Sequence, residues 1–432
     1  MPLDPVALCD GIDRTAATLG KRRLAVAYSG GLDSTVLLTL VVSGSALPVR
    51  ALHVDHGLQG EQPDWRAHVV AACEQRDIAL QVLDVQVTPA PGESVEAAAR
   101  TARYAAFSAA LGDDELLLLA QHRDDQAETL LLQLLRGAGP AGLAAMPAAA
   151  ELGESHLLRP LLGCDRAVLQ DYASAHSLRW FDDPSNADDR FDRNYLRREV
   201  MPRLRERWPG LVTTLSRASD WQGEADRLAS TLAAADARRF ASRPARVDVS
   251  GWSALTPERQ RNLLRFLCRA QSLTTPPARR LESLQALALG DTPRGEVRWP
   301  GGEARRYRHW LHLTPPLPAP PEDAWAAAPD DTGTLDLPQP YGQLHYDRAA
   351  LEGVVVQCRF RQGGERVRRD PDAHSTSFAA WCQREGIAPW LRLRVPLTFV
   401  GDALAVIGTR AVSPDFAAWV PRWSGAPRGL EP

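Results

Sequence analysis

The stretch LAVAYSGGLDSTVLLTL, residues 24–40, decides the fold of this 432-residue chain. It starts with a short apolar run that is typical of a strand buried on both faces. Gly30 and Gly31 follow, and two glycines let the backbone turn tightly with no Cβ in the way. A helical pattern begins just after them, at about residue 34. A strand, a glycine turn and a helix in this order favour a site where backbone N–H groups and a helix dipole meet an anion.

The same alternation continues along the N-terminal half. Apolar runs similar to residues 24–28 recur at 49–54, 80–85 and 115–120. Helical patterns lie between and after these runs, at about 34–42, 63–76, 93–111 and 124–136. The alternation predicts an α/β fold with a doubly wound parallel sheet. Right-handed crossovers would gather the loops that follow the strands along one edge, where ligands bind.

The second half of the chain has a different pattern. Residues 219–290 are typical of helices and show no clear strand, whereas residues 314–333 are rich in proline and acids. Strand-like pieces at 354–360 and 397–409 then surround a helical stretch near 375–385. We therefore expect four segments: a catalytic domain over 1–216, a helical central domain over 217–313, a linker over 314–340 and a small α+β C-terminal domain over 341–432.

Composition disfavours several classes of protein. The chain is 44 % hydrophobic and 24 % charged, as soluble globular proteins are. It has no apolar run of about 18 residues and no signal-peptide pattern at its start, so we expect neither a membrane span nor a membrane partner. The six cysteines are scattered without a C-x-x-C pair, which disfavours a zinc ribbon, an iron–sulfur site and a dithiol redox centre. Free thiols in a reducing cytoplasm are the expected state.

Lysine is almost absent from the chain. Lys21 is the only one, so no other lysine can act as a Walker A or Schiff-base residue. Because Lys21 lies just before the first apolar strand, we expect it to be a solvated flanking residue. The formal net charge of −3 neither favours nor disfavours RNA, since a basic patch can coexist with an acidic remainder.

The glycine turn carries the clearest chemistry. Its residues are Ser29, Gly30, Gly31, Leu32, Asp33 and Ser34. Hydroxyl groups of the two serines can add donors to the backbone N–H groups that would bind a phosphate. Asp33 would repel such a ligand unless Mg²⁺ lies between the carboxylate and the phosphates. The alternative is an ordinary Gly-Gly turn with a serine cap at a strand–helix junction.

This turn is not a Walker A motif and resembles the S-G-G-x-D-S pyrophosphate loop (PP-loop) of the N-type ATP pyrophosphatases. That superfamily includes GMP synthetase, NAD synthetase, asparagine synthetase and several tRNA-modifying enzymes. The resemblance implies a Rossmann-like domain that uses ATP as a co-substrate with Mg²⁺. It also implies cleavage between the α and β phosphates, transfer of AMP to a substrate oxygen, and attack by a nucleophile that expels AMP.

An acidic helix start follows the 115–120 strand, in Gln121–Thr129. Asp125 and Glu128 are three residues apart and share a helix face. They and His122 fit ordinary capping roles, but the stretch resembles the lysidine synthase signature H-x-x-D-x-x-E-T. In that family the carboxylates are implied to hold a metal and to orient or deprotonate an attacking amine. Which acid has which role stays open.

A second match to this family lies in residues 180–198. Asp183-Pro184-Ser185-Asn186 and Arg193-Asn194 resemble its D-x-[ST]-N and R-N submotifs. An arginine fork aimed at phosphates or at a charged intermediate is the expected chemistry of Arg193. Asn186 and Asn194 could recognise polar groups or fix the loop. The alternative is a capped loop that leads into a helix over 194–207.

The resemblance continues through most of the N-terminal half. It includes the segment from His53 to Leu58 (H-V-D-H-G-L), the R-x-x-R-Y pattern within 96–107, and stretches at 136–143 and 159–162. His53 and His122 are thereby candidates for substrate contacts, with a structural role as the alternative.

The C-terminal region resembles the accessory domain of the longer lysidine synthases, through residues 358–369 and 374–392. Its arginines form either a phosphate-contacting surface for tRNA or a solvated basic face: Arg359, Arg361, Arg366, Arg368 and Arg369. For Trp381 and Trp390 we favour core packing over stacking on bases.

Together these resemblances imply a carbon–nitrogen ligase that forms AMP. Its partners would be tRNA(Ile) with a CAU anticodon and free L-lysine, joined at C2 of the wobble cytidine after adenylation. The catalytic candidates are Asp33 with Mg²⁺, Asp125, Glu128 and Arg193. The alternatives are a tRNA thiolase of the same superfamily, which would need reactive cysteines, and a noncatalytic RNA-binding protein. The oligomeric state stays open, with a homodimer as one arrangement.

Overall fold

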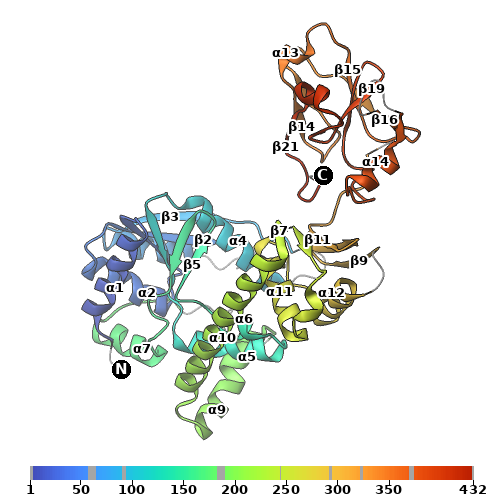
Figure 1. The fold of residues 1–432 in the computed structure, drawn as a ribbon. Helices are drawn as coiled ribbons and strands as arrows, with labels where there is room; N and C mark the ends of the chain where they lie inside the picture. Colours follow the sequence, from blue (N-terminus) through green and yellow to red (C-terminus); the bar gives the residue numbers. More distant parts are fainter. Residues whose placement is uncertain are drawn as a thin grey trace. The chain divides into compact units, whose positions relative to one another are not determined.

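The computed structural model describes residues 3–56, 65–89, 94–181, 190–243, 245–290, 294–321, 325–368 and 374–430. The chain divides into two compact units, Met1–Leu228 and Ala229–Pro432 (Figure 1). Among the described residues, no helix combines the length and apolarity that crossing a membrane requires. All six cysteines are free thiols.

The first unit contains a six-stranded sheet with the order β3-β2-β1-β4-β6-β5. All neighbours pair in parallel except β5 and β6, which form an antiparallel hairpin at one edge. The prediction of a doubly wound parallel sheet is therefore confirmed. The strands are β1 (Arg23–Ala27), β2 (Val49–Asp55), β3 (Ala79–Asp84), β4 (Glu115–Leu118), β5 (Ala149–Leu152) and β6 (Ser155–Leu158).

Helices cover both faces of this sheet. They are α1 (Pro5–Thr18), α2 (Leu32–Gly44), α3 (Trp65–Glu74), α4 (Val95–Ala110), α5 (Arg123–Leu135), α6 (Pro140–Leu143) and α7 (Arg166–Ala175). In β1, Leu24 and Val26 pack in one core cluster with α1, α2, α3 and α7, while Ala25 packs in another with Phe107 of α4. Successive residues of a strand point to opposite faces, so a strand buried on both sides is apolar throughout.

The expectation for Lys21 was wrong. Its side chain is buried, and Nζ donates a hydrogen bond of 2.7 Å to the Asp113 carbonyl. A buried ammonium group needs such an acceptor. Lys21 precedes β1 and therefore lies at the end of the strand opposite to the glycine turn. It cannot serve as a phosphate-binding lysine there.

A less regular helical run closes the first unit. The helix expected over 194–207 consists of α8 (Asp192–Tyr195), a π-helical segment (Leu196–Val200) and α9 (Met201–Arg207). The long helix α10 (Leu211–Phe240) follows. Single π-helical turns are rare and are frequently found at functional sites, so this segment draws attention to its side chains.

The central region is helical as predicted, but the expectation that it contains no clear strand was wrong. Besides α11 (Pro257–Ala270) and α12 (Ala278–Leu289), it contains an antiparallel sheet with the order β7-β8-β11-β10-β9. The strands are β7 (Ala241–Arg243), β8 (Arg246–Asp248), β9 (Arg294–Trp299), β10 (Gly302–Tyr307) and β11 (Trp310–Thr314). They are short, β7 to β10 each contain arginine, and β11 buries Leu311 and Leu313 against the two helices. Such strands lack the apolar runs that mark a strand buried on both faces.

The C-terminal region is rich in short strands. These are β12 (Ala326–Ala327), β13 (Thr334–Asp336), β14 (Gln343–His345), β15 (Val356–Arg359), β16 (Arg366–Val367), β17 (Thr376–Ser377), β18 (Leu397–Val400), β19 (Ala403–Ile407), β20 (Arg410–Ala411) and β21 (Arg422–Ser424). Two short helices accompany them, α13 (Arg348–Leu351) and α14 (Phe378–Arg384). Trp381 is buried in the core of this region and Trp390 packs against it, as expected for core residues.

Candidate active site

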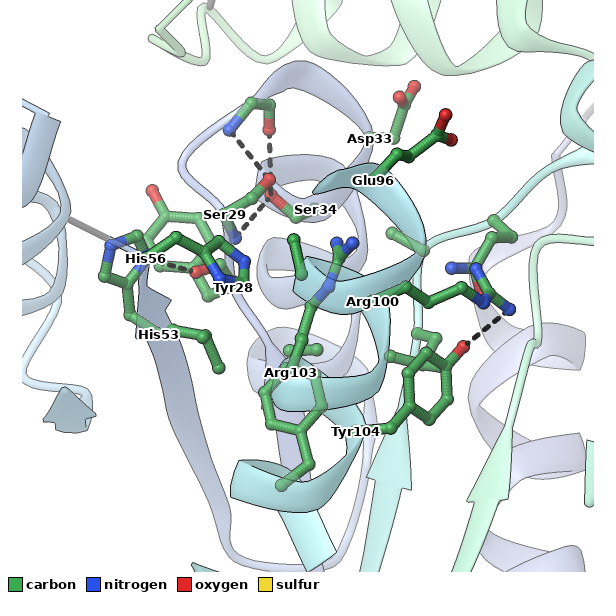
Figure 2. A pocket seen from close by; sticks show the side chains of 18 of the residues that line it. Tyr28, Ser29, Asp33, Ser34, His53, His56, Glu96, Arg100, Arg103 and Tyr104 are labelled. Atoms are coloured by element: carbon green, nitrogen blue, oxygen red, sulfur yellow. Dashed lines mark hydrogen bonds between the residues drawn. The ribbon is translucent and has the colours of Figure 1, made fainter. Parts of the chain in front are cut away.

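A cavity of about 560 Å³ opens at the carboxyl ends of β1, β2 and β4. Its walls come from the glycine turn, from residues 52–56, from α4 and from the segment Phe191–Arg197 (Figure 2). This is the sheet edge where a doubly wound fold places its ligands. Ser29, Gly31, Asp33, Ser34, His53, Asp125, Arg193 and Asn194 all line it.

The glycine turn is shaped by its own hydrogen bonds. The Ser29 N–H donates to Ser34 Oγ at 3.2 Å, and Ser34 Oγ donates to the Gly31 carbonyl at 3.1 Å. Gly30 has a φ of +81°, and a Cβ there would lie 2.9 Å from Val69 Cγ2. Both the backbone and the space therefore require glycine. Gly31 is the N-cap of α2 and provides no side-chain cap, which leaves N–H groups of the first helical turn without a capping acceptor.

Asp33 and His122 connect this turn to the acidic start of α5. Asp33 Oδ2 lies 3.5 Å from His122 Nε2, which also lies 3.4 Å from Asp125 Oδ2. His122 is fully buried, and burial lowers its pKa; the hydrogen bond and charge of Asp33 and the charges of Asp125 and Asp124 outweigh this and raise the pKa overall. The surrounding carboxylates thus raise the pKa of His122.

Two roles were open for the acidic start of α5, helix capping and a place in the site, and the geometry is compatible with both. His122 and Asp125 form a capping box, in which each side chain accepts from the other residue's backbone N–H. Asp124 accepts hydrogen bonds from the Arg166 N–H at 2.8 Å and from the Arg205 guanidinium, so it lies outside the cavity chemistry. Asp125, by contrast, both caps the helix and lines the cavity.

Two arginines neutralise Asp125 and Glu128. Arg193 Nε donates to Glu128 Oε2 at 3.0 Å, and Arg193 Nη2 lies 3.4 Å from Asp125 Oδ1. Arg197 Nε donates to Glu128 Oε1 at 2.7 Å, and its Nη2 donates to Asp125 Oδ1 at 2.7 Å. We had expected Arg193 but missed Arg197, which lies in the π-helical segment. The available signal was its spacing of four residues from Arg193, which places both on one helix face.

The remaining candidates lie as follows. His53 is buried, its Nδ1 lies 2.9 Å from the Tyr28 carbonyl, and burial lowers its pKa more than this hydrogen bond raises it. Asp183 and Asn186 fall outside the described residues.

The five C-terminal arginines divide into groups. Arg359 and Arg361 pair with the buried carboxylate of Glu365, at 2.8 and 3.7 Å. Arg366 is exposed and donates to Ser375 Oγ at 2.7 Å, and Arg368 is exposed as well. Arg369 lies outside the described residues.

Of the acidic candidates, Asp33 fits Mg²⁺ best. Its Oδ1 is buried and has no hydrogen-bond partner among the described residues, with Arg166 Nε 3.9 Å away. Asp125 and Glu128 fit less well, because arginines already compensate their charge. Within the described ranges, no three His, Cys, Asp or Glu side chains gather as a complete metal site. Mg²⁺ usually needs only one or two carboxylates besides substrate phosphates, so Asp33 would hold it together with a bound triphosphate.

Comparison with known proteins finds three family models that match along the chain. Residues 8–204 match the family model of the PP-loop domain, residues 248–312 that of the TilS substrate binding domain, and residues 356–424 that of the TilS substrate C-terminal domain. The chain is 41 % identical to the tRNA(Ile)-lysidine synthase of Methylococcus capsulatus, over 89 % of this chain and 90 % of that protein. It is 42 % identical to the protein of the same name from Pseudomonas aeruginosa, over 92 % of both chains.

Proposed function

The chain belongs to the tRNA(Ile)-lysidine synthase family, and we propose that it ligates free lysine to C2 of the wobble cytidine in CAU-anticodon tRNA(Ile). The cytidine O2 attacks the α-phosphorus of ATP and pyrophosphate leaves. The lysine ε-amine then attacks C2 and loses a proton, and AMP leaves with the former O2. The product pairs with adenosine, so the tRNA would decode AUA as isoleucine instead of AUG as methionine.

The observation that carries this proposal is the glycine turn opposite the Asp125 carboxylate of α5 in one cavity. The turn offers uncapped helix N–H groups to the ATP phosphates. Mg²⁺ on Asp33 would neutralise charge on the β and γ phosphates when bound. His122 lies beside Asp33, with Nε2 3.5 Å from Oδ2, and would help to orient that carboxylate.

Four charged side chains suggest how the lysine amine could be bound and deprotonated: Asp125, Glu128, Arg193 and Arg197. We assign Arg193 to the phosphate of the adenylated cytidine and Asp125 and Glu128 to the lysine amine. When Arg193 turns toward that phosphate, Glu128 Oε2 loses its contact of 3.0 Å to Arg193 and keeps the one of 2.8 Å to Arg197. The less compensated carboxylate would then be a better acceptor for a proton of the amine. Adenylation and amine activation would thereby be coupled through one guanidinium.

The decisive test measures release of AMP and pyrophosphate from ATP in the presence of tRNA(Ile) and lysine. We expect release of both products and incorporation of lysine into the tRNA. A thiolase would be indifferent to lysine, and a noncatalytic RNA-binding protein would release nothing. Asp33→Asn should lose at least a hundredfold in turnover with nearly unchanged tRNA affinity. Asp10→Asn, an exposed acid on α1, controls for the change in net charge.

A further inference from the structure

The cavity contains two arginines that the proposed reaction does not use. Its lining includes the arginines Arg66, Arg100, Arg103, Arg193 and Arg197 and the acids Asp33, Asp55, Glu96 and Asp125. Arg193 and Arg197 are paired with α5, and Arg66 pairs with Asp84 at 2.7 Å. Arg100 and Arg103, both on α4, have no carboxylate within ion-pair distance among the described residues. They are the part of the R-x-x-R-Y pattern that the reaction leaves without a role.

Arg100 is held in place by a built network. Its guanidinium carbon lies 4.9 Å from the centre of the Tyr104 ring, and its Nη2 lies 3.4 Å from the Tyr104 hydroxyl. That hydroxyl also accepts a hydrogen bond of 3.2 Å from Arg159, which is buried and donates to the Pro147 carbonyl at 2.8 Å. Arg159 therefore fixes Tyr104, and Tyr104 orients Arg100 through ring stacking. The remaining N–H groups of Arg100 stay available to a ligand (Figure 2).

Arg103 lies one turn further along the same helix. Its side chain is exposed to the water of the cavity. Desolvation by the cavity walls and the charges of Arg100 and Arg193 lower its pKa, and Tyr104 and Glu96 partly offset this. Like charges three residues apart on one helix repel each other, and an anion bound between or beside them would relieve that repulsion.

We propose that Arg100 and Arg103 form a phosphodiester-binding site for the RNA substrate, separate from the triphosphate site at the glycine turn. The inference rests on the proposed function, because it assumes that a nucleotide of the tRNA enters this cavity. A base must leave its stack to enter, and the backbone beside it then has to be anchored. Guanidinium groups suit this task, since they bind phosphate oxygens with two parallel hydrogen bonds.

ATP is the less suitable ligand for this pair. Its triphosphate already has the glycine turn, the start of α2 and a metal position at Asp33. Figure 2 shows Arg100 and Arg103 extending from α4, a different wall of the cavity from Ser29 and Ser34. Two phosphate-binding walls fit a reaction that joins a nucleoside triphosphate to a polynucleotide.

The test compares the double variant Arg100→Gln/Arg103→Gln with the unmodified full-length chain. The equilibrium dissociation constant for tRNA(Ile) is measured at several salt concentrations, and KM for ATP is measured at saturating tRNA. Loss of two contacts to single-stranded phosphates should flatten the slope of log Kd against log salt by about 1.4. We expect about tenfold weaker tRNA binding at moderate salt and a KM for ATP within about twofold of the original.

Two further variants separate charge from folding. Arg100→Lys/Arg103→Lys keeps both charges and should retain most of the salt dependence. Arg14→Gln removes a charge at an exposed position on α1, a helix that does not line the cavity. It should change neither the salt dependence of tRNA binding nor KM for ATP. An equal loss of salt dependence in the lysine variant would show that charge is not the cause and would overturn the proposal.

Two other outcomes would also overturn the proposal. A raised KM for ATP with an unchanged tRNA salt slope would assign the two arginines to the nucleotide and overturn the RNA site. Unchanged values for both would also overturn it. Failure of the proposed function is distinguishable, because the unmodified chain would then bind tRNA without lysine-dependent release of AMP.

Discussion

Arg197 binds Glu128 through two nitrogens, with Nε 2.7 Å from Oε1 and Nη2 2.8 Å from Oε2. Glu128 is almost wholly buried, and its neighbour Asp125 shares the same guanidinium at 2.7 Å. These carboxylates raise the pKa of Arg197, although its burial opposes them. The pair joins the π-helical segment to α5 and fixes the position of the two acids that we assign to lysine.

Arg197→Gln should therefore destabilise the first unit. It leaves Glu128 buried with only Arg193 as a partner, and breaking a buried pair on one side costs about 2 to 3 kcal/mol. For a unit of this size, that lowers the unfolding midpoint by roughly 6 °C, which calorimetry can measure. Arg203→Gln is the matched control, because Arg203 is 81 % exposed and lies 3.6 Å from Glu199. An exposed pair of this kind contributes below about 0.5 kcal/mol, so an equal effect of both variants would contradict the assignment.

His122 should make stability depend on pH with a definite sign. Its pKa in the folded protein is raised above the ordinary value of 6.5. The folded state then binds the proton more tightly than the unfolded state does, and the stabilisation is full below pH 6.5. It is lost as the pH rises through the folded-state pKa. The measurement is the unfolding midpoint between about pH 5.5 and 8.5, in which His122→Asn should remove the decline on the alkaline side.

His53 should show the opposite sign. Burial lowers its pKa below 6.5, so the unfolded state binds the proton more tightly. Its contribution is full above pH 6.5 and declines as the pH falls through the window between that value and the lowered folded-state pKa. His53→Asn should flatten the acidic side of the same profile. A change on the alkaline side instead would show that the proton is assigned to the wrong histidine.

Gly30→Ala should damage ATP binding more than it damages stability. The backbone there has a φ of +81°, and the new Cβ would press on Val69 at 2.9 Å, so the turn must shift. We expect KM for ATP to rise at least tenfold, since a misplaced phosphate-binding group loses most of its contribution. Gly20→Ala is the control, because Gly20 has a φ of +69° with nothing within 4 Å of the added Cβ. It bears a similar backbone cost of about 1 kcal/mol, and a similar rise of KM in this control would contradict the role of the turn.

We expect substitutions of the C-terminal arginines to have two different effects, one on tRNA binding and one on stability. Reversing the charge of the exposed Arg366 and Arg368 should weaken tRNA binding and flatten its salt dependence. Arg359→Gln should instead lower the stability of the second unit, because Arg359 compensates the buried Glu365 at 2.8 Å. Filter binding over a salt series and calorimetry distinguish the two effects. Equal loss of tRNA affinity in both variants would show that Arg359 belongs to the RNA surface as well.

Local sequence pattern was sufficient to predict the strands and the phosphate-binding turn of the first unit. The apolar runs of the N-terminal half specify strands without reference to distant residues; the central strands β1 and β4 are largely buried, whereas the edge strand β3 is partly exposed. Gly30 and Gly31 identify the phosphate turn in the same way, because the constraint on φ and the following helix lie within a few residues. The central sheet escaped prediction because its strands are short, and β9 and β10 contain arginines and few apolar residues.

Only the tertiary structure determines which charged side chains form ion pairs with one another. Asp125 and Glu128 lie on α5, while Arg193 and Arg197 follow some 65 to 72 residues later and meet them through folding. The sequence shows an arginine at each position but not its partner, since side chains so far apart are joined by packing and not by periodicity. The same physics separates the paired Arg359 from the exposed Arg368, and the paired Arg193 from Arg100 and Arg103, which have no carboxylate within ion-pair distance in the described part of the chain. The charged residues can be identified from the sequence, but which of them form ion pairs depends on the fold.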